Sequence, residues 1–191
     1  EHAAWAALLT ALRGLLPRRF YAHLSPGLAE TLAADYRLES HGRHLKMVLE
    51  DRARLARPDT AAVVRLDEAD LPALESLYRA AYPDNWFDPR MLQTRHYFGL
   101  RRGSDLVSVA GVHVYSPAYG VAALGNITTH PDYRGQGLAR AVAARLCQVL
   151  LQTVDVVGLN VKADNAAAIA CYRRLGFAEV AAYEELMGLG W

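Results

Sequence analysis

Arginine and glycine recur at short spacing in residues 134–140, where backbone and side chains together could bind an anion. The stretch reads Arg-Gly-Gln-Gly-Leu-Ala-Arg. A strand-like segment precedes it, and the helical spacing of Leu138, Val142 and Leu146 follows. The first N–H groups of a helix have no partner inside the helix, and two glycines remove side chains that would keep a phosphate away. The pattern therefore predicts a phosphate-binding turn at the head of a helix.

Neither of the common nucleotide-binding loops is present. The chain has no Gly-x-x-x-x-Gly-Lys-Ser/Thr, and no Gly-x-Gly-x-x-Gly follows a strand. What is present is Arg134-x-x-Gly137-x-Ala139. This pattern resembles the pyrophosphate-binding signature of the GNAT superfamily of N-acetyltransferases, Gln/Arg-x-x-Gly-x-Gly/Ala. The approach to it, residues 130–133, reads His-Pro-Asp-Tyr, as is usual in that superfamily.

A second motif follows in the expected order, with a helix and a strand between the two. Asn165-x-x-Ala-x-x-x-Tyr172-x-x-x-Gly176-Phe177 is similar to the second signature of the superfamily. The joint resemblance extends from residue 61 to the C-terminus and implies an N-acetyltransferase. Such an enzyme transfers an acetyl group from acetyl-coenzyme A directly to a primary amine, on a peptide or on a small molecule, and needs no metal.

The resemblance also implies a fold and a set of cofactor-binding residues. The implied fold is α/β (α+β), with a mixed, mostly antiparallel sheet whose central strands splay apart between flanking helices. Pantetheine would lie between residues 127–129 and residues 157–160. The residues implied to bind the cofactor are Ile127, Thr128, Thr129, Arg134, Gly135, Gln136, Gly137, Leu138, Ala139, Arg140 and Asn165.

For catalysis, Tyr172 stands where the superfamily places its general acid. A phenol suits the task because its hydrogen bond to the departing sulfur strengthens as negative charge develops there. The base is less defined, since Asn160 and residues 121–124 occupy the places where many relatives carry a Glu. The candidates are His113, Tyr115, His130 and a water relayed by Asn126 or Asn160, and we select His113. The missing Glu keeps a second hypothesis open, a non-catalytic acyl-coenzyme A binding or sensing module.

Composition narrows the possible partners. The 191 residues are 52% hydrophobic, and 21 basic and 20 acidic side chains give a net charge of +1 without a basic stripe. A nucleic-acid partner is therefore not expected. Both cysteines, Cys147 and Cys171, fall inside expected helices, which argues against a disulfide framework or a zinc ribbon and favours the cytoplasm. The first uncharged run is too short to span a bilayer, so no membrane partner is expected.

Local patterns predict the elements that would position this chemistry. Capping residues, periodic apolar positions and turn residues define them. In residues 59–191 we expect strands at 61–66, 97–101, 106–115, 121–129, 154–161 and 178–187, and helices at 67–81, 88–95, from 138, and at 165–175. Strands joined by short turns should be antiparallel, and the strand that follows the motif helix should pair in parallel.

Residues 1–58 read as a small helix and strand extension, whose last residues belong to a linker at residues 51–59. We expect a helix at 3–16, a strand at 20–24, a helix after Ser25-Pro26, and strands at 36–40 and 44–49 joined by a His41-Gly42 turn. Two roles remain open for this extension. It could bind a partner or form a homodimer, or it could be a lid over the first helix of the enzyme domain.

Overall fold

The computed structural model describes residues 2–191, in which eight strands follow the order β1-β8-β2-β7-β6-β5-β4-β3. The chain divides into two compact units. The first comprises residues 2–46, 161–166 and 179–191, and the second comprises residues 47–160 and 167–178. The second unit contains both the glycine turn and Tyr172.

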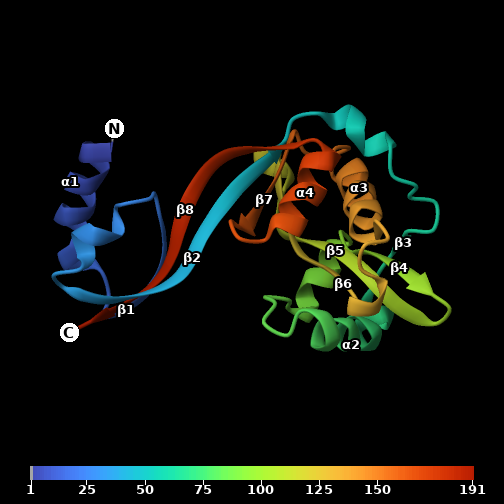
Figure 1. The fold of residues 1–191 in the computed structure, drawn as a ribbon, viewed down its shortest axis with the longest axis horizontal. Coiled ribbons are helices and arrows are strands. Elements are labelled where there is room, and N and C mark those ends of the chain that lie inside the picture. Colours follow the sequence, from blue (N-terminus) through green and yellow to red (C-terminus); the bar gives the residue numbers. More distant parts are fainter. Residues whose placement is uncertain (1) are drawn as a thin grey trace. The chain divides into compact units, whose positions relative to one another are not determined.

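The second unit is a sheet with helices on both faces. Its elements are β3 (Val64–Arg65), α2 (Leu71–Ala81), β4 (Phe98–Arg102), β5 (Asp105–Ser116), β6 (Val121–Thr129), α3 (Leu138–Leu150), and its parts of β7 (Val156–Lys162), α4 (Ala166–Leu175) and β8 (Phe177–Gly190). Helices α3 and α4 lie on one face of the strands β4, β5 and β6, and α2 lies on the other (Figure 1). The expected mixed, mostly antiparallel sheet with flanking helices is confirmed.

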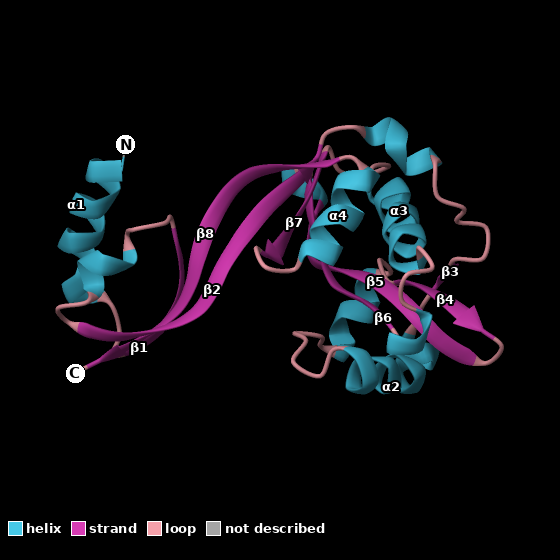
Figure 2. Ribbon diagram, viewed as in Figure 1, coloured by secondary structure: helices cyan, strands magenta, loops and turns pink. Residues whose placement is uncertain are grey.

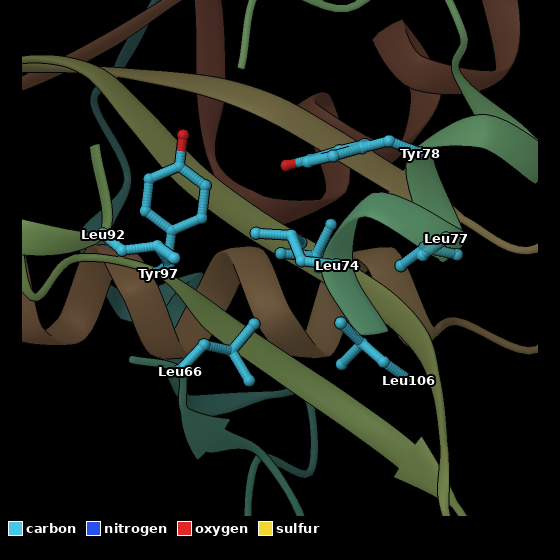
Figure 3. Packing of buried hydrophobic residues seen from close by; sticks show 8 residues of the cluster. Leu66, Leu74, Leu77, Tyr78, Leu92, Tyr97 and Leu106 are labelled. Atoms are coloured by element: carbon cyan, nitrogen blue, oxygen red, sulfur yellow. The ribbon is translucent and has the colours of Figure 1, made fainter. Parts of the chain in front are cut away.

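Helix α2 buries the expected face, but it begins at Leu71, four residues after the predicted start at Asp67, because a 3-10 turn occupies residues 68–70. Asp67 starts a short 3-10 turn, because its carboxylate accepts from the N–H of Ala69 at 2.8 Å and its own N–H donates to Asp70 at 3.0 Å. The apolar positions of the helix then pack on the sheet face that α2 covers. This cluster contains Leu66, Leu74, Leu77, Tyr78, Leu92, Tyr97, Leu106 and Val109 (Figure 3).

Strands β6 and β7 pair in parallel along only part of their length. Their register runs from Val121 opposite Val156 to Leu124 opposite Leu159, and the described pairing ends there. β6 nevertheless continues to Thr129, and there it remains paired with β5. The two strands therefore separate after Leu124, in front of the turn that leads into α3.

Gly176 ends α4 in a conformation that other residues rarely adopt. Its φ is 100°, its carbonyl accepts from the N–H groups of Glu50 and Asp51, and an added Cβ would overlap the carbonyl oxygen of Asp51. We expect Gly176→Ala to lower the free energy of unfolding by about 3 kcal/mol, from backbone strain and steric overlap together. Gly103→Ala is the control, because Gly103 also has a positive φ but open space around it, and it should lose only about 1 kcal/mol. Equal losses in denaturant titrations would show that the Asp51 contact is unimportant.

The first unit is built on strands β1, β8 and β2, with a helical N-terminal segment (Figure 2). Its other elements are α1 (His2–Leu12), a 3-10 turn at Arg13–Leu15, β1 (Arg19–Leu24), a 3-10 turn at Ala29–Leu32, and most of β2 (Tyr36–Leu49). β1 and β8 pair antiparallel from Arg19 opposite Leu189 to Leu24 opposite Glu184. The expected strand at 20–24 is confirmed.

Two predictions for this unit are wrong. The helix expected after Ser25-Pro26 is only a 3-10 turn, because Gly27 takes a φ of 83° and interrupts a regular helix start. The turn expected at His41-Gly42 does not interrupt the strand, and β2 runs on through it. Gly42 has a φ of 97° inside this strand, so its conformation is accommodated within the β2 ribbon.

Candidate cofactor and active site

The turn between β6 and α3 has the backbone shape that its glycines predict. Gly135 and Gly137 both have φ of 78°, in the left-handed region that glycine adopts without strain. A Cβ at Gly135 would meet no atom within 4 Å, and one at Gly137 would meet only the Arg140 guanidinium at 3.7 Å. The space above both residues is therefore open.

Six consecutive backbone N–H groups of this turn are free. Within the described chain, no N–H from Gly135 to Arg140 donates a hydrogen bond, and the first bonded one belongs to Ala141, which donates to the Gly137 carbonyl at 3.1 Å. The side-chain Nε of Arg140 is buried and also lacks a partner. Unpaired donors are costly unless a ligand or water satisfies them, and α3 adds partial positive charge at its N-terminus. The residues thus fit an anionic group with several acceptor oxygens, as a diphosphate is.

Arg134 is held beside this turn by backbone carbonyls. Its Nε donates to the Thr129 carbonyl at 3.3 Å and a terminal nitrogen donates to the Ala81 carbonyl at 3.5 Å, both long bonds on an exposed side chain. An incoming anion could replace these weak bonds without a large cost. The Thr129 hydroxyl is paired with Ser108 Oγ at 2.9 Å, and the Thr128 carbonyl accepts from the same Ser108 hydroxyl at 3.2 Å.

The open part of the strand pair differs from the predicted one. Residues 157–159 pair with β6, so the prediction that they line the gap is wrong, because the parallel ladder extends as far as Leu159. On β6 the unpaired side begins at Gly125 and includes Ile127 and Thr129, which are half-buried. On β7 the first residue beyond the ladder is Asn160, which is exposed.

Tyr172 lies on α4 with a half-buried side chain. Its ring packs edge to face on Phe177, with centroids 6.0 Å apart. Burial raises the pKa of the phenol well above its usual range, and the neighbouring Cys171, Tyr82 and Cys147 add to the shift. A raised pKa keeps the hydroxyl protonated at neutral and mildly alkaline pH, as a proton donor requires.

The α4 segment that carries Tyr172 is within electrostatic reach of the glycine turn. Burial raises the pKa of the adjacent Cys171 thiol, and the guanidinium groups of Arg140 and Arg174 partly offset that rise. Arg140 is the last residue of the turn with a free N–H. Arg140 of the first motif and the Cys171–Tyr172 part of the second motif therefore lie near each other in the second unit.

Among the base candidates, His113 lies at the point where the strands separate. A Cβ added to Gly125 would overlap the His113 ring, so the imidazole lies directly against the first β6 residue beyond the ladder. Its side chain is exposed. Tyr115 is directed elsewhere, because its hydroxyl pairs with Thr153 Oγ1 at 2.9 Å, near the start of β7. The His130 ring caps the short turn after β6, where Nδ1 accepts from the N–H of Asp132 at 3.4 Å.

The sequence suggests Asn126 only as a relay for a water, whereas in the structure this residue is buried inside the strand. It has a φ of 53° and is 3% exposed, in the middle of β6. In the sequence, a Gly-Asn pair inside an otherwise regular strand pattern is a signal for a bulge, and this signal points to Asn126.

Asn165, the expected cofactor-binding residue of the second motif, directly precedes α4. Its N–H donates to the Lys162 carbonyl at 3.0 Å.

Two kinds of site are not found in residues 2–191. No cluster of three or more His, Cys, Asp or Glu side chains there is arranged to hold a metal ion. No helix in the same range is both long enough and apolar enough to cross a bilayer. Cys147 is buried and Cys171 is half-buried, and both are free thiols.

Comparisons with known proteins agree with this geometry. Residues 60–177 match the family model described as the acetyltransferase (GNAT) family. The chain is 35% identical over 119 residues to the ribosomal protein bS18-alanine N-acetyltransferase of Escherichia coli strain K12, covering 60% of this chain and 78% of that protein. It is 30% identical over 164 residues to the mycothiol acetyltransferase of Beutenbergia cavernae, covering 83% of this chain and 50% of that protein.

Solved structures show the same fold. A GNAT-family protein from Novosphingobium aromaticivorans superposes with a TM-score of 0.69 at 23% identity, over 95% of this chain and 80% of that one. The ribosomal-protein-S18-alanine N-acetyltransferase from Escherichia coli superposes with a TM-score of 0.53 at 27% identity, over 68% of this chain and 94% of that one. The family model covers more than half of the chain and includes both motifs. The chain therefore belongs to the GNAT family and is an N-acetyltransferase.

Proposed function

We propose that the glycine turn binds the diphosphate of acetyl-coenzyme A and that the acetyl group is transferred to a primary amine held at the separation of β6 and β7. The row of free N–H groups from Gly135 to Arg140 carries this proposal. Such a row, at the N-terminus of a thirteen-residue helix, suits a diphosphate better than a single carboxylate, because it offers more donors than two oxygens can use.

One set of residues would bind the diphosphate and pantetheine of the cofactor, and another would act on its thioester. Backbone groups of the turn and Arg140 would hold the diphosphate, and the unpaired side of residues 127–129 would align the pantetheine. When bound, acetyl-coenzyme A supplies a thioester whose carbonyl carbon an amine can attack. Tyr172 would then donate its hydroxyl proton to the departing sulfur, and His113 would accept a proton from the attacking nitrogen.

The acceptor is proposed as a primary amine on a peptide or a small molecule. The relatives include proteins of both kinds. The Escherichia coli relative is named as a ribosomal protein alanine N-acetyltransferase, and the Beutenbergia cavernae relative as a mycothiol acetyltransferase. On this chain the loop after α2 presents Tyr82 and Trp86 with exposed fractions of 38% and 72%. Tyr82 is also one of the groups that shift the pKa of Tyr172, so this loop is near the proposed acid and could contact the acceptor.

An acceptor screen tests the proposed reaction. The full chain is incubated with acetyl-coenzyme A and a panel containing a peptide with an N-terminal alanine, a lysine peptide, an amino sugar and a polyamine. Free thiol and acetylated product should form in equal amounts with at least one class. Binding of coenzyme A without thiol release for the entire panel would instead favour the non-catalytic acyl-coenzyme A module.

His113→Gln tests the proposed base. We expect turnover to fall about tenfold, less than the hundredfold or more that is typical of a general base, because bulk water can replace the exposed imidazole in part. The affinity for coenzyme A should stay within about twofold of wild type, since the ring does not contact the glycine turn. His96→Gln is the control, because His96 is a half-buried histidine outside the proposed site, two residues before β4. A similar loss in both variants, or none in His113→Gln, would remove His113 from the reaction.

Two further assignments follow the same proposal. Residues 59–191 would be the acetyltransferase domain, and residues 1–58 an extension to it, a division supported by the start of the family match at residue 60. The extension could form a homodimer, and light scattering of the whole chain would test that. The cytoplasm is the proposed location, because the free thiols and the use of acetyl-coenzyme A suit a reducing compartment.

A further inference from the structure

Strand β6 carries one strained residue, and it lies where the strand leaves β7. Asn126 has a left-handed backbone with a φ of 53°, an uncommon conformation for a residue other than glycine. The register with β5 shifts at this point, because Thr128 lies opposite Val109 whereas Gly125 lies opposite Gly111. Two β6 residues, 126 and 127, therefore oppose the single β5 residue 110. This is a β-bulge, which bends the strand and redirects the residues after it.

Two buried tyrosines from the α2 face of the sheet hold this bulge. The hydroxyl of Tyr78, on α2, donates to the Asn126 carbonyl at 2.9 Å. The side-chain Nδ2 of Asn126 donates to the Tyr97 hydroxyl at 3.0 Å, and that hydroxyl donates to the Met91 sulfur at 3.3 Å. In Figure 3 the Tyr97 hydroxyl points away from Leu66, and the Tyr78 hydroxyl lies at the end of its ring that faces Tyr97. Both rings are almost fully buried, at 3% and 0% exposure.

The bulge is maintained at a cost in stability. Besides its left-handed backbone, Asn126 has a buried Oδ1 without a partner in residues 2–191. An unpaired buried acceptor and a strained φ each oppose folding. Strain of this kind persists where the surrounding structure determines it, and such positions cluster at functional sites. Here the residues that follow are 127–129, on the side of β6 that β7 leaves open.

The hydroxyl groups of Tyr78 and Tyr97 stay protonated, so their hydrogen bonds to Asn126 do not depend on pH. Burial raises the pKa of Tyr78 far above its usual range and raises that of Tyr97 to about 12. Both hydroxyls therefore keep their protons at any pH at which the protein would be assayed. The hold on Asn126 does not weaken through ionisation.

We propose that Tyr78 and Tyr97 are positioning residues for the cofactor: by fixing the Asn126 bulge they aim residues 127–129 at the pantetheine. This inference rests on the proposed function. Neither tyrosine contacts the glycine turn, so each acts through Asn126. Tyr78 has the larger part, since it bonds the backbone of Asn126 rather than its side chain.

Variants that each lack one tyrosine hydroxyl test the positioning role, with a matched control variant in the other compact unit. Tyr78→Phe should raise the calorimetric Kd for coenzyme A about tenfold, and Tyr97→Phe should raise it by less. Tyr36→Phe is the control, because the Tyr36 hydroxyl also donates to a backbone carbonyl, that of Leu16 at 3.1 Å, and its side chain is likewise buried, at 7% exposure. The control should lose a similar amount of thermal stability and bind coenzyme A like wild type.

A second readout does not depend on the cofactor. Hydrogen exchange of peptides covering residues 125–129 should be about tenfold faster in Tyr78→Phe than in wild type, and unchanged in Tyr36→Phe. Wild-type affinity together with wild-type exchange in Tyr78→Phe would overturn the positioning role and leave the proposed function intact. Failure of the wild-type chain to bind coenzyme A would instead remove the proposed function and, with it, the assignment of the bulge to the cofactor.

Discussion

Gly137→Glu abolishes the binding of coenzyme A, and acetyl transfer is lost with it. The new side chain would project from a left-handed residue into open space in front of the free N–H groups, where the diphosphate is proposed to lie. Its carboxylate could take up those donors itself, and it repels the incoming anion. One negative charge at about 4 Å from another costs about 4 kcal/mol at the effective dielectric near a protein surface, which corresponds to about a thousandfold in Kd.

A second glycine provides the control for strain and charge. Gly103, in the turn between β4 and β5, also has a positive φ, of 60°, and open space around it. Gly103→Glu adds the same side chain to a similar backbone away from the turn. Calorimetric titration with coenzyme A should show wild-type heat for Gly103→Glu and none for Gly137→Glu. Retained affinity in Gly137→Glu would mean that the diphosphate binds elsewhere.

Tyr172→Phe slows acetyl transfer by about a hundredfold or more while coenzyme A binds almost as well as to wild type. Loss of a general acid typically costs about 10²–10⁴ in rate. The substitution keeps the ring that packs on Phe177, so the fold around α4 should be preserved. The effect should therefore fall on kcat rather than on the Kd of the cofactor.

The pH dependence of turnover gives an independent check on Tyr172. Because its pKa is raised, the folded protein keeps this proton at pH values where a free tyrosine, with a pKa of about 10, would lose it. Ionisation of Tyr172 should thus cause no fall in wild-type turnover between about pH 10 and pH 11, where a free tyrosine would be half ionised or more. Tyr115→Phe is the matched control, since that hydroxyl pairs with Thr153, and it should be nearly as active as wild type. Unchanged turnover in Tyr172→Phe would assign the ring to packing alone.

Local sequence signals were sufficient for the elements that carry the two motifs. The three-and-four spacing of apolar residues correctly predicted α3, and Gly176 correctly marked the end of α4. Asp67 marked the start of the 3-10 turn that leads into α2. The conformations of Gly135 and Gly137 could also be anticipated, because only glycine makes such a turn without strain. These features depend on residues close together in the chain.

Features that depend on distant partners could not be read from the sequence. The turn expected at His41-Gly42 is absent because β2 continues through it as a single strand. The length of the β6–β7 ladder, which sets where the gap opens, depends on register rather than on composition. The bulge at Asn126 needs Tyr78, which is 48 positions away in the chain. No periodicity in either segment indicates that contact.

The most direct test of the central claim measures by titration calorimetry how coenzyme A and pantetheine bind to the wild-type chain and to Gly137→Glu. Pantetheine lacks the diphosphate and the phosphorylated adenosine attached to it, and Gly137→Glu blocks only the site proposed for the diphosphate. If the six free N–H groups and Arg140 hold the diphosphate, coenzyme A should bind the wild-type chain at least about a hundredfold more tightly than pantetheine, as the loss of several charge-assisted hydrogen bonds implies. This difference should be lost in Gly137→Glu. Equal affinities of the wild-type chain for the two compounds, an undiminished difference in Gly137→Glu, or no heat with coenzyme A and the wild-type chain would contradict the account.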